Sequence, residues 1–112
     1  MNNISEFISI VTKNGFEPQH SEEGVIIYRK EWQPGLSARL TVGRDGWTLG
    51  PAIDLTKLLS GDPDDWPDWI GESVSDHSSE SKQFDLDEFT AAYERILTFI
   101  GRVADHYKIT KL

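Results

Sequence analysis

Toward the C-terminal end of the sequence, apolar residues recur at steps of three and four, which is typical of one face of an α-helix. We expect this helix within residues 84–107. Asp85 and Glu88 have the spacing of a capping box, and Phe84 and Phe89 that of a hydrophobic staple. The predicted buried stripe is Leu86, Phe89, Tyr93, Ile96, Leu97, Ile100, Val103, Ala104 and Tyr107.

A shorter amphipathic helix is predicted over residues 3–14. Asn3 can cap its start, and Gly15 can end it by taking the left-handed conformation. Phe16 follows and is free to fold back onto the helix. The apolar positions of this second helix are Ile4, Phe7, Ile8 and Val11.

Between the two helices the pattern changes to the alternation typical of β-strands. Strands are predicted over residues 24–32, 36–42 and 47–53, with a short fourth strand at 16–20. Pro34-Gly35 predicts a type II turn, and Asp45-Gly46 predicts a hairpin turn of type I′. Gly50-Pro51 indicates a bulge or an edge position, because proline cannot donate to a strand ladder.

These elements predict one α+β domain over residues 1–112: a three- to four-stranded antiparallel meander covered on one face by the two helices, as a two-layer sandwich. Asp54 is expected to cap a short helical turn that ends at Gly61. Residues 60–83 form an acidic region rich in tryptophan and proline, and Ser73–Lys82, which has no periodicity, is expected to be a loop.

The composition excludes several classes of function but does not identify one. The chain has no cysteine, which excludes a disulfide framework, thiol catalysis and cysteine-ligated metals. Its first six residues lack a basic region followed by an apolar run, and no apolar run approaches the roughly 20 residues that span a bilayer, so a cytoplasmic location is expected. Its net charge is −8, and residues 54–88 alone hold eleven acidic and two basic groups. A surface of this sign repels nucleic acid and anionic membranes and attracts basic partners.

No catalytic or metal-binding motif is present. His20, His77 and His106 lack the spacing of a metal-binding helix face, and neither a Gly-x-Ser-x-Gly elbow nor a phosphate-binding glycine loop occurs. The aspartates from Asp62 onward do not match a calcium-binding loop, because Trp66 and Pro67 stand where an acid and a glycine are needed. We therefore expect no enzyme activity, no metal and no cofactor.

The predicted partner-binding site lies in the acidic segment, where rigid aromatic side chains could anchor a contact and carboxylates could select a basic partner. The alternative is that the tryptophans close the end of the core. The polar face of the sheet, with Arg29, Glu31, Arg39, Thr41 and Thr48, is a second candidate surface. The predicted partner-binding residues are Asp62, Asp64, Asp65, Trp66, Asp68, Trp69 and Glu72.

Three classes of function fit this sequence. The first is an acidic protein that binds and neutralises a basic protein, such as an immunity protein against a toxin or an inhibitor of a nucleic-acid-binding protein. The second is an adaptor or chaperone-like module of a bacterial-type complex with an apolar interface. The third is an enzyme or small-ligand binder whose site the sequence does not reveal. We favour the first class; the sequence does not distinguish a monomer from an oligomer.

Overall fold

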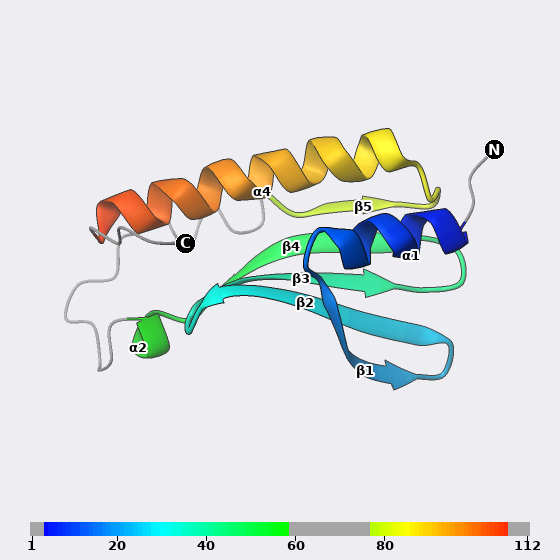
Figure 1. The fold of residues 1–112 in the computed structure, drawn as a ribbon, viewed down its shortest axis with the longest axis horizontal. Helices are drawn as coiled ribbons and strands as arrows, with labels where there is room; N and C mark the ends of the chain where they lie inside the picture. Colours follow the sequence, from blue (N-terminus) through cyan, green and yellow to red (C-terminus); the bar gives the residue numbers. More distant parts are fainter. Residues whose placement is uncertain (1–3, 59–76, 108–112) are drawn as a thin grey trace.

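The computed structural model describes residues 4–58 and 77–107 of the 112-residue chain. They form a five-stranded antiparallel sheet on which two helices pack (Figure 1). The α+β fold is confirmed, with one strand more than expected. The elements are α1 (Ile4–Lys13), β1 (Glu17–Glu22), β2 (Val25–Gln33), β3 (Leu36–Val42), β4 (Trp47–Ile53), α2 (Leu55–Leu58), β5 (Ser79–Ser81) and α4 (Leu86–His106).

The strands lie in the sheet in the order in which they occur in the chain, so the sheet is a simple meander. Both β3 and β4 have the predicted bounds, whereas the short first strand extends to Glu22. The prediction of a loop over Ser73–Lys82 is wrong at Ser79–Ser81, which pairs with β4 as an additional strand. Three polar residues give no local strand signal, so the pairing itself must set their conformation.

The two predicted turns have different outcomes. Gly35 follows Pro34 with a φ of +94°, as the third position of a type II turn requires. The type I′ prediction for Asp45-Gly46 is wrong, because neither residue has the positive φ that this turn needs at both central positions. The link between β3 and β4 is four residues long, and its ends are joined by a hydrogen bond from Gly43 N–H to the Gly46 carbonyl, at 2.8 Å.

Pro51 lies at an edge of the sheet without a bulge. The register between β3 and β4 is continuous, and Pro51 is opposite Ala38. In an antiparallel ladder, hydrogen-bonded pairs alternate with non-hydrogen-bonded pairs. The Asp54 N–H donates to the Gly35 carbonyl, so Gly35–Asp54 is a hydrogen-bonded pair. Three pairs further along, Ala38–Pro51 is therefore a non-hydrogen-bonded pair. The nitrogen of Pro51, which carries no hydrogen, therefore faces away from β3. On that side of β4, strand β5 pairs only with residues 47–49 and does not extend to Pro51.

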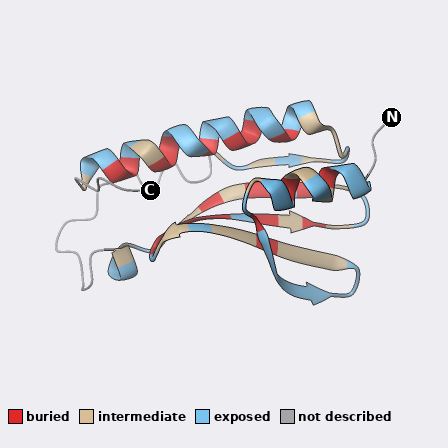
Figure 2. Cartoon of the chain, viewed as in Figure 1, coloured by how far each residue is buried: buried red, intermediate tan, exposed pale blue. Residues whose placement is uncertain are grey.

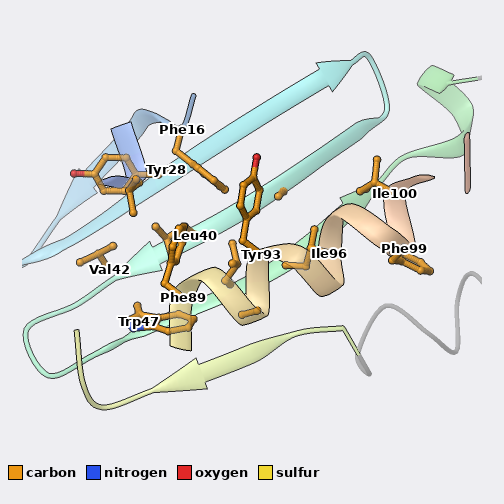
Figure 3. Packing of buried hydrophobic residues seen from close by; sticks show 14 of the residues in the cluster. Phe16, Tyr28, Leu40, Val42, Trp47, Phe89, Tyr93, Ile96, Phe99 and Ile100 are labelled. Carbon is orange, nitrogen blue, oxygen red and sulfur yellow. The ribbon is translucent and has the colours of Figure 1, made fainter. Parts of the chain in front are cut away.

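One hydrophobic cluster joins both helices to a single face of the sheet. Buried positions line the sides of α1 and α4 that face the strands (Figure 2). The ring of Phe7 from α1 lies 5.7 Å from that of Trp47 and 5.2 Å from that of Phe89, between centroids. Phe84 also contacts Phe7, so the predicted staple closes through a third ring. Figure 3 shows the part of this core that α4 covers.

Helix α4 begins as predicted, but its N-terminal contacts differ in one respect. The Asp85 carboxylate accepts hydrogen bonds from the N–H groups of Asp87 and Glu88, at 2.8 and 3.3 Å. The Glu88 carboxylate does not complete a capping box; it accepts a hydrogen bond from Ser81 in β5. The buried stripe also differs from the prediction, since Leu97 is 39% exposed and Phe99 is buried.

Lys30 joins three elements on the helix-covered face of β2. Its ammonium donates to the Asn14 carbonyl beyond the end of α1, at 2.7 Å, and to the Tyr93 hydroxyl of α4, at 2.5 Å. It also lies 5.3 Å from the ring centroids of Trp32 and Tyr93. A cation is favourable next to the carbonyl end of a helix, so this lysine stabilises the packing of α1.

Candidate functional site

The partner-binding residues predicted from the sequence lie outside the residues that the structure describes. The candidate site must therefore be sought on the described surface, for which the structure gives positions and contacts. The predicted residues concerned are Asp62, Asp64, Asp65, Trp66, Asp68, Trp69 and Glu72.

A groove of about 550 Å³ lies between strand β5 and the exposed flank of helix α4. The two elements run side by side (Figures 1 and 3). Ala91 and the edge of the buried Trp47 supply apolar surface between the polar walls. The remaining lining residues are Ser79, Glu80, Ser81, Glu88, Glu94, Arg95 and Thr98.

Two side-chain hydrogen bonds hold β5 beside α4. Ser81 donates to the carboxylate of Glu88, and Arg95 donates to the hydroxyl of Ser79. Between these two anchors the facing position on the helix is the small residue Ala91, which leaves room for the groove. These two hydrogen bonds therefore position the walls of the groove.

Close contact with the β3–β4 link fixes the other side of β5. A Cβ atom added to Gly46 would lie 2.0 Å from the Ser81 carbonyl oxygen, so only glycine fits there without movement of the backbone. The indole N–H of Trp47 donates to the Gln83 carbonyl at 2.7 Å and fixes the turn that follows β5.

The groove carries more negative than positive charge. Glu88 and Glu94 contribute two carboxylates, and Arg95 contributes the single cation among the lining residues; Glu80, opposite Thr48, lines the groove with its backbone and directs its carboxylate to the other face of the sheet. Within the described part of the chain, Arg95 has no carboxylate within 4 Å. Since the whole chain carries a net charge of −8, the long-range field and the local charge of the groove have the same sign.

The outer edge of β5 has no neighbouring strand among the described residues. The hydrogen bond that closes the β3–β4 link makes Thr41–Thr48 a hydrogen-bonded pair, so Thr48 directs its N–H and carbonyl to β3. Thr48–Glu80 is therefore a non-hydrogen-bonded pair, and Ser79 and Ser81 on either side form the hydrogen-bonded pairs with β4. The main-chain N–H and carbonyl of Glu80 therefore point away from β4. No strand within residues 4–58 and 77–107 pairs with them.

The second candidate surface is located as predicted, on the face of the sheet opposite the helices. The register pairs Arg29 with Arg39, and Thr41 with Thr48, on this face. Arg29 also donates to Glu31 at 2.9 Å. Like charges directly opposite each other destabilise a sheet, so the arginine pair is a local cost to stability. The mixed signs on this face do not select one class of partner.

The histidines do not form a site in the described part of the chain. His20 lies in β1, and its Nε2 is 3.2 Å from a carboxylate oxygen of Glu22. His77 stacks on Phe99 with ring centroids 4.5 Å apart, and His106 lies in the last turn of α4. No group of three potential metal ligands occurs within residues 4–58 and 77–107.

No helix among the described residues combines the length and the apolar character needed to cross a membrane. Comparison of the chain with protein-family models, with curated proteins and with solved structures gave no match. The geometry and charge of the groove are therefore the basis for inferring a function.

Proposed function

We propose that this protein is a non-enzymatic binding protein that holds an extended basic segment of a partner protein in the groove between β5 and α4. Neutralisation of that partner is the biological consequence that we favour, as for an immunity protein or an inhibitor of a nucleic-acid-binding protein. The proposal is supported by one observation: the same groove has more carboxylates than cations and includes a strand edge that no described strand pairs with.

Negative charge favours a basic partner both at long range and at contact. The net charge of −8 attracts a basic partner over about 10 Å at moderate ionic strength, which raises the association rate. At contact, Glu88 and Glu94 offer carboxylates to individual lysine or arginine side chains. The acidic residues from Asp62 to Glu72 add to the long-range field, and we propose that they contribute mainly to the association rate.

The adaptor alternative needs an apolar interface, and the described surface offers little support for one. The large hydrophobic side chains exposed there are Ile4, at 43%, and Leu97, at 39%. Ile4 lies at the start of α1 and Leu97 lies on α4. A contiguous apolar patch of several hundred Å² would be typical of a salt-insensitive interface. We also propose a cytoplasmic location for the protein.

The test uses a fluorescent eight-residue peptide of alternating lysine and valine, capped at both ends, and measures its dissociation constant between 25 and 500 mM NaCl. We expect binding that weakens steeply with salt. The double variant Glu88→Gln/Glu94→Gln keeps the hydrogen-bond acceptor for Ser81 and should weaken binding by roughly three- to tenfold, as two partly exposed ion pairs are lost.

The matched control is Glu6→Gln/Glu17→Gln, which removes the same charge from exposed positions outside the groove. Equal weakening by both double variants would refute the groove as the site. Peptide binding that is absent at every salt concentration would refute the proposed function. A third variant, Asp64→Asn/Asp65→Asn/Asp68→Asn, should lower the association rate with little change in the dissociation rate.

A further inference from the structure

We infer that the basic segment binds by strand addition, as a sixth strand beside β5 with its basic side chains directed at α4. This inference rests on the proposed function and deepens it, because it specifies the backbone conformation and the side-chain pattern of the partner. It commits to one occupant: a segment of a protein with lysine or arginine at alternate positions.

The outer edge of β5 carries backbone groups that can form hydrogen bonds with an added strand. Glu80 presents its N–H and carbonyl to the open edge, whereas Ser79 and Ser81 direct theirs to β4. An incoming strand can form a hydrogen-bonded pair with Glu80, and this pair supplies affinity without regard to sequence.

The spacing of alternate side chains on an incoming strand is close to the spacing of two carboxylates on α4. Glu88 and Glu94 are six residues apart on the helix, which is about 9 Å along its axis. Alternate side chains of a strand are about 7 Å apart. Flexible lysine or arginine side chains span the difference, so two alternate basic residues can each meet a carboxylate.

Pairing with Glu80 determines which residues of the partner direct their side chains toward α4. Glu80 is paired with Thr48, whose side chain lies on the sheet face opposite the helices. A residue bonded to Glu80 points its side chain to that same face. Its two neighbours then point their side chains toward α4 and their N–H groups toward solvent. The basic side chains must therefore belong to residues that do not hydrogen-bond to β5.

A second copy of this chain is a poor occupant of the edge. Symmetric antiparallel pairing of two β5 strands would place Glu80 opposite Glu80, and like charges directly opposite each other are unfavourable. The excess negative charge of the chain acts in the same direction. Charge complementarity thus favours a basic segment from a different protein.

The decisive experiment compares two isomers of the lysine–valine peptide, N-methylated either on every valine or on every lysine. Both isomers have the same composition, charge and number of tertiary amides. With the lysines facing α4, the valine N–H groups are the ones that pair with β5. We expect the valine-methylated isomer to bind at least tenfold more weakly than the lysine-methylated isomer. The amide of Glu80 should also become protected from hydrogen exchange when the unmethylated peptide binds.

Two substitutions on α4 test the groove itself without altering charge. Ala91 and Thr90 are both exposed, but only Ala91 lines the groove. Ala91→Phe should fill the groove and weaken peptide binding at least tenfold, whereas Thr90→Phe should leave the dissociation constant within twofold. Unchanged circular dichroism and melting temperature for both variants would show that the fold is retained.

The outcomes separate this inference from the proposed function. Equal affinity of the two methylated isomers, with binding still weakened by Glu88→Gln/Glu94→Gln, would overturn strand addition and leave the basic-segment function standing. Self-association of the chain that depends on β5 and is released by the peptide would show that a second copy is the occupant, and would overturn the inference. Failure of every peptide to bind would overturn both proposals.

Discussion

The N-cap of α4 gives the sharpest test of how the groove is built. Asp85 accepts hydrogen bonds from the N–H groups of Asp87 and Glu88, and Glu88 in turn holds Ser81 of β5. Substitution of Asp85 by alanine leaves those first-turn N–H groups without a side-chain partner. We predict a less stable protein and a loosened first turn of α4, on which one wall of the groove depends.

The magnitude follows from two contributions. Loss of an N-cap oxygen costs about 1 kcal/mol, and loss of a negative charge at a helix N-terminus costs about 0.3–1 kcal/mol more. For a chain of 112 residues, an unfolding entropy of about 2.1 cal/mol/K per residue converts each kcal/mol into a change of about 4 °C in the melting temperature. Asp85→Ala should therefore lower the melting temperature by about 5–8 °C.

Two further variants separate the contribution of the capping oxygen of Asp85 to stability from the contribution of its negative charge. Asp85→Asn keeps an acceptor oxygen and should lose only about 1–4 °C. Asp87→Asn removes a neighbouring first-turn charge that caps no N–H group, so it reports the dipole contribution alone. Thermal unfolding followed by circular dichroism measures all three. If Asp85→Asn is as unstable as Asp85→Ala, the capping hydrogen bonds are not the source of the stability and the reasoning fails.

Three further substitutions have expected outcomes that equilibrium urea unfolding can measure. Gly46→Ala should lower the free energy of unfolding by about 1–3 kcal/mol, because the added Cβ would meet the Ser81 carbonyl and displace β5. Wild-type amide chemical shifts in the NMR spectrum of the β5 residues would contradict this. Lys30→Met should cost about 1–3 kcal/mol, since it leaves the hydroxyl and carbonyl acceptors of the ammonium unpaired, and wild-type stability would count against that role. Arg39→Thr should stabilise the sheet by roughly 0.2–1 kcal/mol, because it removes the like charge opposite Arg29; clear destabilisation would show that the pair is not repulsive.

The elements with strong local patterns were predictable from the sequence. The alternation of Leu36–Val42 and the polar cap before α4 each depend on residues close together in the chain. Gly15 N–H and Phe16 N–H bond back to α1 at 3.0 and 3.2 Å, as the helix-stop signal predicted. In each case local chemistry and tertiary packing favour the same conformation.

The features that define the groove could not be predicted because they arise between distant segments. Strand β5 contains Ser79, Glu80 and Ser81, none of which has a strong strand preference, and its pairing with β4 spans about thirty residues of chain. The helix pattern placed Leu97 in the core instead of Phe99, because a stripe drawn from spacing alone cannot show how wide a face the sheet covers. One signal was available: Glu88, Ala91, Glu94, Arg95 and Thr98 recur at steps of three and four on the polar side of α4.

The groove has a physical property that couples binding to local order. Strand β5 buries no large apolar side chain, so its position depends on the pairing with β4 and on the side-chain bonds from Ser79 and Ser81 to α4. Each such bond contributes only about 1 kcal/mol, whereas the aromatic core beneath α4 secures the helix independently of β5. The outer edge of β5 is thus held less firmly than the core, and local opening there need not cost the global free energy of unfolding. A strand added beside Glu80 would stabilise β5 from its free side, so hydrogen-exchange protection on binding should rise at β5 far more than in the core.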